Sequence, residues 1–131
     1  MSVFISARDA LALDQASFVD GSWFLPGSSK TGFEAFMSQR IAGADFFDLD
    51  AVCDPTSDLP HMAPGRNTFE RWARSNPFNP DDPVIIYDQA GSLGAARVWW
   101  TFRRFGLDAQ ILDGGLVAWQ EAGGPFEQGL P

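Results

Sequence analysis

The chain has 131 residues, a formal net charge of −8, one lysine, one cysteine and one histidine. The acidic balance argues against nucleic acid and against an anionic membrane surface as partners, because both are bound through positive side chains. A single cysteine excludes an internal disulfide framework, and one Cys with one His argues against a zinc site. No apolar run reaches the roughly 20 residues of a membrane span. The N-terminal residues do not have a signal-peptide pattern, so we expect a cytoplasmic protein.

Short apolar segments alternate with helical patterns along the whole chain. Strands are predicted at residues 3–5, 17–20, 44–48, 84–87 and 109–112. Helices are predicted at residues 6–13, with Ser6 as the capping residue, and at 33–40, 68–75, 95–105 and 116–122. This alternation predicts one α/β domain over residues 1–131, with a mostly parallel sheet and helices on both faces. The Gly- and Pro-containing segment 123–131 is interpreted as the start of a linker to a further domain.

The most informative segment is VIIYDQAGSLGAARVWWTFRRF, residues 84–105. An apolar strand leads through a loop of small residues into a helix, which directs backbone N–H groups and the positive end of the helix dipole toward one point. Such a site suits an anion or a reactive thiolate. The residue at the strand exit is Asp88, so a carboxylate occupies the nucleophile position.

Four aspartates end or directly follow predicted strands. In a parallel sheet these strand ends share one edge, where α/β proteins bind ligands. One interpretation is a Mg²⁺ site of the kind found in phospho-acceptor domains, and the other is that each carboxylate caps a helix or accepts from loop N–H groups. The phospho-acceptor site also needs a lysine after a late strand, whereas the lysine here is Lys30, so we expect no metal site. These aspartates are Asp20, Asp48, Asp88 and Asp113.

The order and spacing of several motifs resemble the rhodanese-like sulfurtransferase family, specifically the N-terminal, non-catalytic domain of the tandem-domain 3-mercaptopyruvate and thiosulfate sulfurtransferases. The resemblance extends from about residue 3 to about residue 125. Ala42 departs from it, because the family usually has proline there. The matching motifs are FVD (18–20) with Trp23, IAGA (41–44), FFDLD (46–50), Ser57, PHMAP (60–64), IYD (86–88), RVWW (97–100), FG (105–106) and LDGG (112–115) with Trp119.

The resemblance implies a five-stranded parallel sheet and a catalytic cysteine carried only by the C-terminal domain, in the loop after the fourth strand. It implies that an aspartate, here Asp88, replaces that cysteine, so this domain alone is expected to be inactive. It also implies that Asp50 and His61 contribute to an active site between the two domains. The alternative for this pair is structural: His61 bonds to its own loop and Asp50 caps a turn. Cys53 is flanked by acidic residues, which raise the pKa of a thiol, and is not expected to replace the missing nucleophile.

The function implied by the resemblance is transfer of sulfane sulfur from a small anionic donor, 3-mercaptopyruvate or thiosulfate, to an acceptor such as cyanide or a thiol. The persulfide would form on a cysteine of the C-terminal domain, which would be the partner of this one, and no cofactor is implied. The alternative is a stand-alone inactive rhodanese module that binds proteins.

Overall fold

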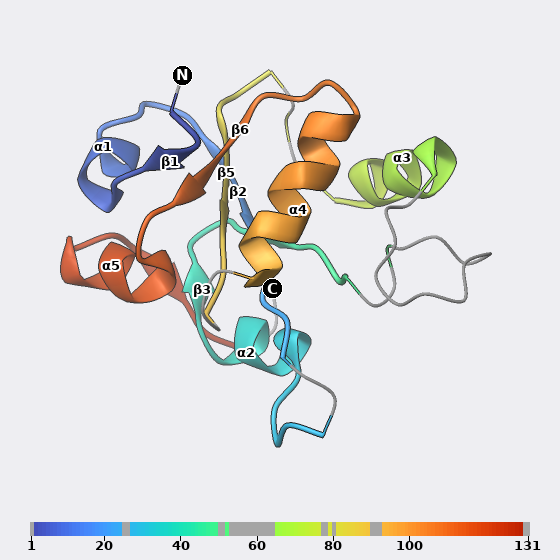
Figure 1. Cartoon of the computed structure of the whole chain (residues 1–131). Coiled ribbons are helices and arrows are strands. Elements are labelled where there is room, and N and C mark those ends of the chain that lie inside the picture. Colours follow the sequence, from blue (N-terminus) through green and yellow to red (C-terminus); the bar gives the residue numbers. More distant parts are fainter. Residues whose placement is uncertain are drawn as a thin grey trace.

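A parallel five-stranded sheet forms the centre of the computed structural model, which describes residues 2–24, 27–49, 52, 65–76, 79, 81–89 and 93–129. The spatial order of the strands is β1-β6-β5-β2-β4, and every neighbouring pair is parallel. Figure 1 shows the strands between two groups of helices. The strands are β1 (Phe4–Ile5), β2 (Ser17–Asp20), β4 (Asp45–Phe46), β5 (Val84–Tyr87) and β6 (Ala109–Leu112).

The predicted strands are confirmed, and β2, β5 and β6 have the predicted bounds. All four residues of β5 are buried, which agrees with its uninterrupted apolar sequence at the centre of a sheet that is covered on both faces. Strand β2 pairs with β5 in the register Asp20↔Tyr87, so the last residues of these two strands lie side by side.

Helices occupy the predicted segments with shifts of a few residues at their ends. They are α1 (Ala7–Leu11), α2 (Gly32–Ser38), α3 (Arg66–Ser75), α4 (Leu93–Arg104) and α5 (Gly115–Glu121). The predicted cap of the first helix is confirmed, because the Ser6 side chain accepts from the backbone N–H of Asp9. Helix α2 begins with a capping box in which Thr31 and Glu34 each accept the other's backbone N–H. It ends at Ser38 rather than at the predicted Arg40.

Each face of the sheet has its own hydrophobic core, as expected for a sheet between two helical layers. Alternate residues of β5 point to opposite faces: Ile86 packs with α3 and α4, and Ile85 packs with α1, α2 and α5. The core under α3 and α4 is rich in aromatic rings that pack at centroid distances of 4.8–6.3 Å. Its rings are Phe47, Phe69, Trp72, Phe102 and Phe105.

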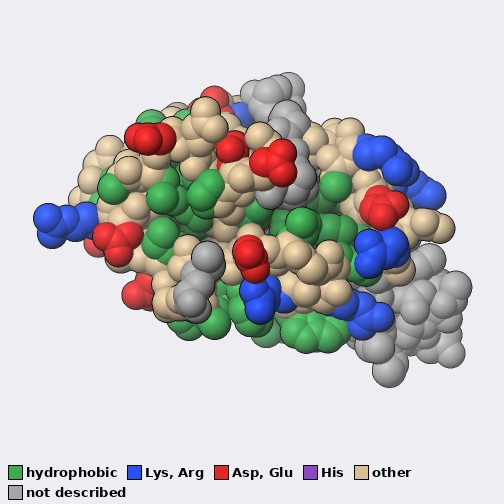
Figure 2. All heavy atoms as spheres, turned by 90° about the horizontal axis from the view of Figure 1, so that it is seen from above, with side chains coloured by type: hydrophobic (Ala, Val, Ile, Leu, Met, Phe, Trp, Pro, Cys, Tyr) green, Lys and Arg blue, Asp and Glu red, His purple; other side chains and the backbone are tan. Residues whose placement is uncertain are grey.

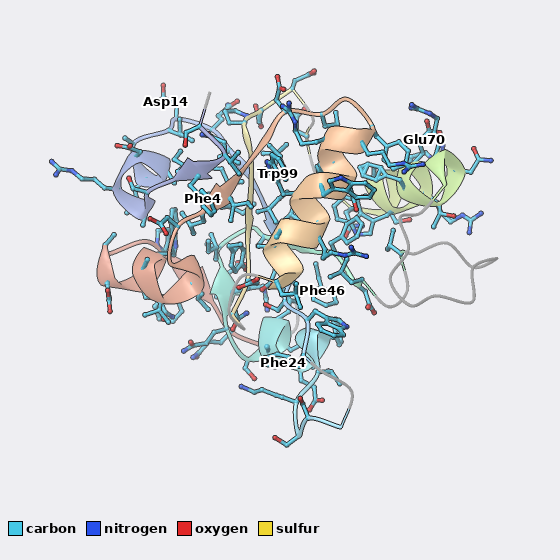
Figure 3. All side chains as sticks on the ribbon, in the orientation of Figure 1. Phe4, Asp14, Phe24, Phe46, Glu70 and Trp99 are labelled. Carbon is cyan, nitrogen blue, oxygen red and sulfur yellow. The ribbon has the colours of Figure 1, made fainter. Side chains whose placement is uncertain are left out.

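Tryptophan side chains fix helices to the sheet through their indole N–H groups. Trp72 donates to the Phe46 carbonyl at 2.9 Å, and Trp99 donates to the Ala109 carbonyl at 2.9 Å. Figure 3 shows Trp99 between β6 and α4, where it packs against the core on this face of the sheet. Among the helices of the described ranges, none is long and apolar enough to cross a bilayer.

A second, two-stranded antiparallel sheet was not predicted from the sequence. It pairs β3 (Arg40–Ile41) with β7 (Phe126–Glu127), so part of the segment interpreted as a linker belongs to this fold. Arg40 is only 2% exposed. Its Nη1 donates to the Phe36 and Gly129 carbonyls, and its Nε lies 3.5 Å from Glu127 Oε1. The domain therefore includes the chain at least as far as Gly129, and a further domain beyond it stays a prediction.

Candidate functional site at the carboxyl end of the sheet

The carboxyl ends of the parallel strands meet the first turns of α4 and α5. Asp20 is the last residue of β2, and Asp88 directly follows β5, the fourth strand of the five-stranded sheet in chain order. Figure 1 shows the first turn of α4 near α2, at the end of the sheet to which these strands lead. In α/β folds with a parallel sheet, ligands bind at the edge formed by the carboxyl ends of the strands.

Asp88 is 6% exposed, and its carboxylate belongs to the start of α4. Its Oδ2 accepts the backbone N–H of Ala95, the third residue of that helix, at 2.9 Å. A carboxylate at the first helical turn satisfies an N–H group that has no partner within the helix and interacts favourably with the helix dipole. The contact is of the predicted kind, a carboxylate held by a backbone amide. The Asp88 carboxylate thus occupies the position where an anion or a thiolate would be stabilised.

The first turn of α5 contacts the backbone of Asp88. The Asp88 carbonyl accepts the N–H of Leu116 at 3.4 Å. A Cβ added to Gly115 would lie 2.5 Å from the Asp88 carbonyl oxygen, and the φ of Gly115 is +62°, so this position requires glycine. A pocket of about 310 Å³ opens beside these residues. Its lining includes Asp88, Gly115 and three glutamine side chains, those of Gln39, Gln89 and Gln120.

Gln89 connects the end of β5 to the end of β2. Its Nε2 donates to Asp20 Oδ2 at 2.9 Å and to the Gln39 carbonyl at 2.8 Å, and its backbone N–H donates to Ser22 Oγ at 2.9 Å. Asp20 is fully buried, and its Oδ1 accepts the backbone N–H of Ser22 at 2.8 Å. Burial raises the pKa of Asp20 above its usual value, while hydrogen bonds from Ser22, Gln89 and Tyr87 act in the opposite direction. Asp20 therefore has a structural role in this network.

The other two strand-end aspartates lie in different surroundings. Asp113 is exposed, and Asp48 lines a separate pocket of about 400 Å³ together with Ser22, Trp23 and Lys30. In the part of the chain that the structure describes, no group of three or more His, Cys, Asp or Glu side chains lies close enough to hold a metal ion.

Several residues singled out from the sequence lie outside the described residues: Asp50, Cys53, Ser57 and the PHMAP motif (60–64) with His61. The roles expected for Asp50 and His61 in an active site between domains stay predictions. Gln89 and Ser22 were not singled out from the sequence, although each is a polar residue two positions beyond the last residue of a strand, close to an aspartate that was.

Several positive side chains lie on α3 and on the last turn of α4, namely Arg66, Arg71, Arg74, Arg103 and Arg104. Figure 2 views the domain from the side away from the carboxyl ends of the strands and shows several Lys and Arg side chains on the right, with others at the left end and in the middle. Arg103 and Arg104 are at the far end of α4 from the turn that contacts Asp88, whereas Arg97 lies in the second turn of this helix. The net charge of −8 disfavours an anion at long range, so an anion bound at Asp88 would gain from positive groups of another source.

Comparison with known families gives one match that covers most of the chain. The profile described as "Rhodanese-like domain" matches residues 4–122. The human 3-mercaptopyruvate sulfurtransferase is 40% identical over 114 residues, which is 85% of this chain and 38% of that protein. The 3-mercaptopyruvate sulfurtransferase of Escherichia coli K12 is 36% identical over 117 residues, 88% of this chain and 42% of that protein.

Solved structures agree with these relatives. The crystal structure of SseA from Escherichia coli, whose description names 3-mercaptopyruvate sulfotransferases, superposes with a TM-score of 0.87 at 32% identity. That match covers 100% of this chain and 52% of the other. The Tum1 protein of Saccharomyces cerevisiae superposes with a TM-score of 0.84 at 26% identity, over 98% of this chain and 45% of the other. The chain thus spans less than half of the curated relatives quoted, and the matched part lies at their N-terminal end.

Proposed function

Since the chain belongs to the rhodanese-like domain family, we propose that it is the non-catalytic domain of a tandem-domain sulfurtransferase. In this proposal the catalytic cysteine is carried by a companion rhodanese domain, and the sulfur donor is a small anion, 3-mercaptopyruvate or thiosulfate. Relatives named thiosulfate/3-mercaptopyruvate and 3-mercaptopyruvate sulfurtransferases support the sulfurtransferase assignment.

The observation that carries the proposal is the buried carboxylate of Asp88 at the start of α4. Sulfur transfer needs a thiolate that attacks the transferable sulfur of the donor. A new S–S bond forms while the C–S bond of 3-mercaptopyruvate or the S–S bond of thiosulfate breaks, and pyruvate (after protonation of its enolate) or sulfite leaves. The persulfide then passes its outer sulfur to an acceptor, and the thiolate is restored. A carboxylate can accept the same backbone N–H groups, but it cannot form and release a persulfide.

The charge distribution supports a companion domain as the source of anion-binding groups. The chain carries a net charge of −8, and two of the three arginines of α4, Arg103 and Arg104, lie in the last turn of the helix, far from the turn that contacts Asp88. An anionic donor would therefore be repelled by this domain at long range and would need cationic residues elsewhere. In the proposal, this domain contributes Asp50 and His61 to the site, and the companion contributes the cysteine and the cations.

Intact mass spectrometry tests the inactivity of the domain by itself. The protein is incubated with 3-mercaptopyruvate or thiosulfate, and we expect no stoichiometric gain of about 32 Da, the mass of one sulfur atom. The control is Cys53→Ser, which removes the thiol of the chain. A stoichiometric adduct that disappears in this variant, together with steady thiocyanate formation from cyanide, would contradict the proposal.

Complementation tests the role in an assembled active site. The isolated cysteine-bearing half of the Escherichia coli relative is assayed with and without this domain, and we expect added domain to raise kcat/KM at least tenfold. Asp50→Asn and His61→Ala should remove most of that gain. Glu121→Gln, which changes an exposed residue at the end of α5, should retain it.

Binding to other proteins without any effect on sulfur transfer would instead favour the stand-alone module as the function. The cytoplasmic location also stays a prediction, and a mitochondrial relative gives a reason to test it by cell fractionation.

A further inference from the structure

A groove of about 810 Å³ lies beyond the edge strand β4, away from the pocket beside Asp88. Helix α2, strand β4, the end of α3 and the last described segment of the chain form its walls. Figure 3 labels Phe46, which lies beside α2. The aromatic and charged residues of its lining are Phe33, Phe36, Arg40, Asp45, Phe46 and Glu127.

Three phenylalanine rings pack together along one wall. The ring centroid of Phe46 lies 5.6 Å from that of Phe33 and 5.3 Å from that of Phe36. Phe33 is 46% exposed, which is unusual for a phenylalanine that already contacts two other rings. The wall therefore presents aromatic surface to a ligand, and aromatic faces attract cations.

Asp45 adds a carboxylate without a partner to the same groove. Among the described residues it makes no side-chain hydrogen bond or ion pair, although its environment is partly dehydrated. Burial raises its pKa to about 6. Partial burial makes the ionised form of Asp45 less favourable. A bound cation would stabilise that form and offset part of the free-energy cost, so the groove favours a positively charged ligand at this position.

The remaining charged groups that line the groove are already engaged with each other. Arg40 is buried, donates to the Phe36 and Gly129 carbonyls, and its Nε lies 3.5 Å from Glu127 Oε1. Its guanidinium carbon also lies 5.0 Å from the centroid of the Phe36 ring, so this wall already holds one guanidinium against an aromatic face. Asp45 is left as the uncompensated charge, and the domain around it is acidic overall.

We propose that this groove binds an organic cation, a guanidinium or ammonium group on an apolar stem, with the head at Asp45 and the stem on Phe33 and Phe46. Such a cation is carried by arginine and lysine side chains of peptides and by small free molecules. The site is separate from the sulfurtransferase function proposed above, and its tests involve no sulfur transfer.

The first experiment titrates the protein with butylguanidinium at pH 8 and follows backbone amide shifts by NMR. We expect saturable shifts at Phe33, Asp45 and Phe46, with a dissociation constant on the order of 1 mM. Butylurea is the matched probe, because it has nearly the same shape without the charge, and we expect it to bind at least tenfold more weakly. Asp45→Asn should weaken butylguanidinium binding about tenfold, and Glu121→Gln, which removes one exposed carboxylate outside the groove, should leave it unchanged.

Repeating the titration at pH 5 tests the role of the Asp45 carboxylate. With a pKa of about 6 only about one tenth of the Asp45 side chains are ionised at pH 5, so binding should weaken about tenfold. Arg40 and Glu127 are the other charged groups that line the groove, and both are retained in the Asp45→Asn variant. The Asp45→Asn variant should therefore lose most of the difference between the two pH values.

An acetylated and amidated tetrapeptide with a single arginine separates the two sources of the cation. Tenfold tighter binding than butylguanidinium, with shifts that extend to Asn76 and Gln128 at the groove, assigns the site to a peptide side chain. Equal affinity assigns it to a small free cation. The proposal is wrong if butylurea binds as well as butylguanidinium, or if Asp45→Asn and Glu121→Gln have the same effect.

Discussion

The backbone of Gly115 lies against the carbonyl oxygen of Asp88, so closely that a Cβ at position 115 would be 2.5 Å from it. We expect Gly115→Ala to lower the free energy of unfolding by about 2 kcal/mol or more, because it adds both a steric clash and a side chain at a φ of +62°. Gly43→Ala is the control: its φ is +80° but nothing lies within 4 Å of the added Cβ, so it should cost only about 1 kcal/mol. Urea unfolding of both variants measures the difference, and equal costs would contradict the close contact.

Replacing Asp88 by cysteine should not restore sulfur transfer. We expect Asp88→Cys to form thiocyanate from thiosulfate and cyanide at a rate no more than a few times that of Asp113→Cys, an exposed cysteine at the end of β6. The reason is that the loop QAGSL at residues 89–93 follows an aspartate rather than a cysteine and is not expected to hold a persulfide, and that the proposal assigns the donor's cationic groups to the companion domain. Sustained turnover by Asp88→Cys, well above the control, would show that the loop is competent.

The Asp45 carboxyl should make the protein less stable as pH rises. Between pH 3.8 and about 6 the folded state binds its proton more strongly than the unfolded chain does, so the stability contribution is present below this window and is lost above it. Asp45→Asn should therefore raise the free energy of unfolding by about 1 kcal/mol at pH 7.5, after allowance for solvent screening, and change it little at pH 3.5. Urea unfolding at the two pH values measures this, and a loss of stability at pH 7.5 would contradict it.

Arg40 should hold the last described segment of the chain in place. We expect Arg40→Ala to lower the free energy of unfolding by about 3 kcal/mol, because it removes a buried side chain that packs on Phe36 and accounts for contacts to Glu127 and Gly129. The amide of Gly129, which donates to the Met37 carbonyl, should exchange faster with solvent. Arg103→Ala, which breaks an exposed ion pair to Asp108, should cost less than about 0.5 kcal/mol and leave the Gly129 amide unchanged.

The main sheet could be predicted from the sequence because its central strands are buried on both faces. A strand such as β5 then appears as an uninterrupted apolar run, and the predicted bounds of β2, β5 and β6 agree with the structure. Helix α1 was predicted to begin at its capping serine for a similarly local reason, because the cap and the helix are neighbours in the chain.

The small sheet could not be predicted in the same way. Strand β3 has two residues and pairs with β7, more than eighty residues away, so no periodic pattern marks either strand. Arg40 was predicted as the last residue of a helix, and nothing in the local sequence indicates that its side chain is buried. Its surroundings include the Gly129 carbonyl and Glu127, which come from a segment whose glycines and prolines suggested a linker.

The candidate site was predicted in its position but only partly in its composition. Asp88 stood out because a single carboxylate follows a buried strand and precedes a helix, and the structure places it at the first turn of α4. The contacts of Gln89 to Asp20 and Gln39 depend on how two strands and a helix end come together, which a single sequence does not reveal.

The hydrogen bond from the Trp72 indole to the Phe46 carbonyl couples a fluorescent side chain to the groove beyond β4. Phe46 lines the groove on one side, and through its carbonyl it is joined to an indole that is 8% exposed and packed among phenylalanine rings. A ligand that moves Phe46 changes the electrostatic field at this indole. The chain has five tryptophans, so we expect a variant in which the other four are replaced by phenylalanine to report occupancy of the groove through the intensity or emission wavelength of Trp72.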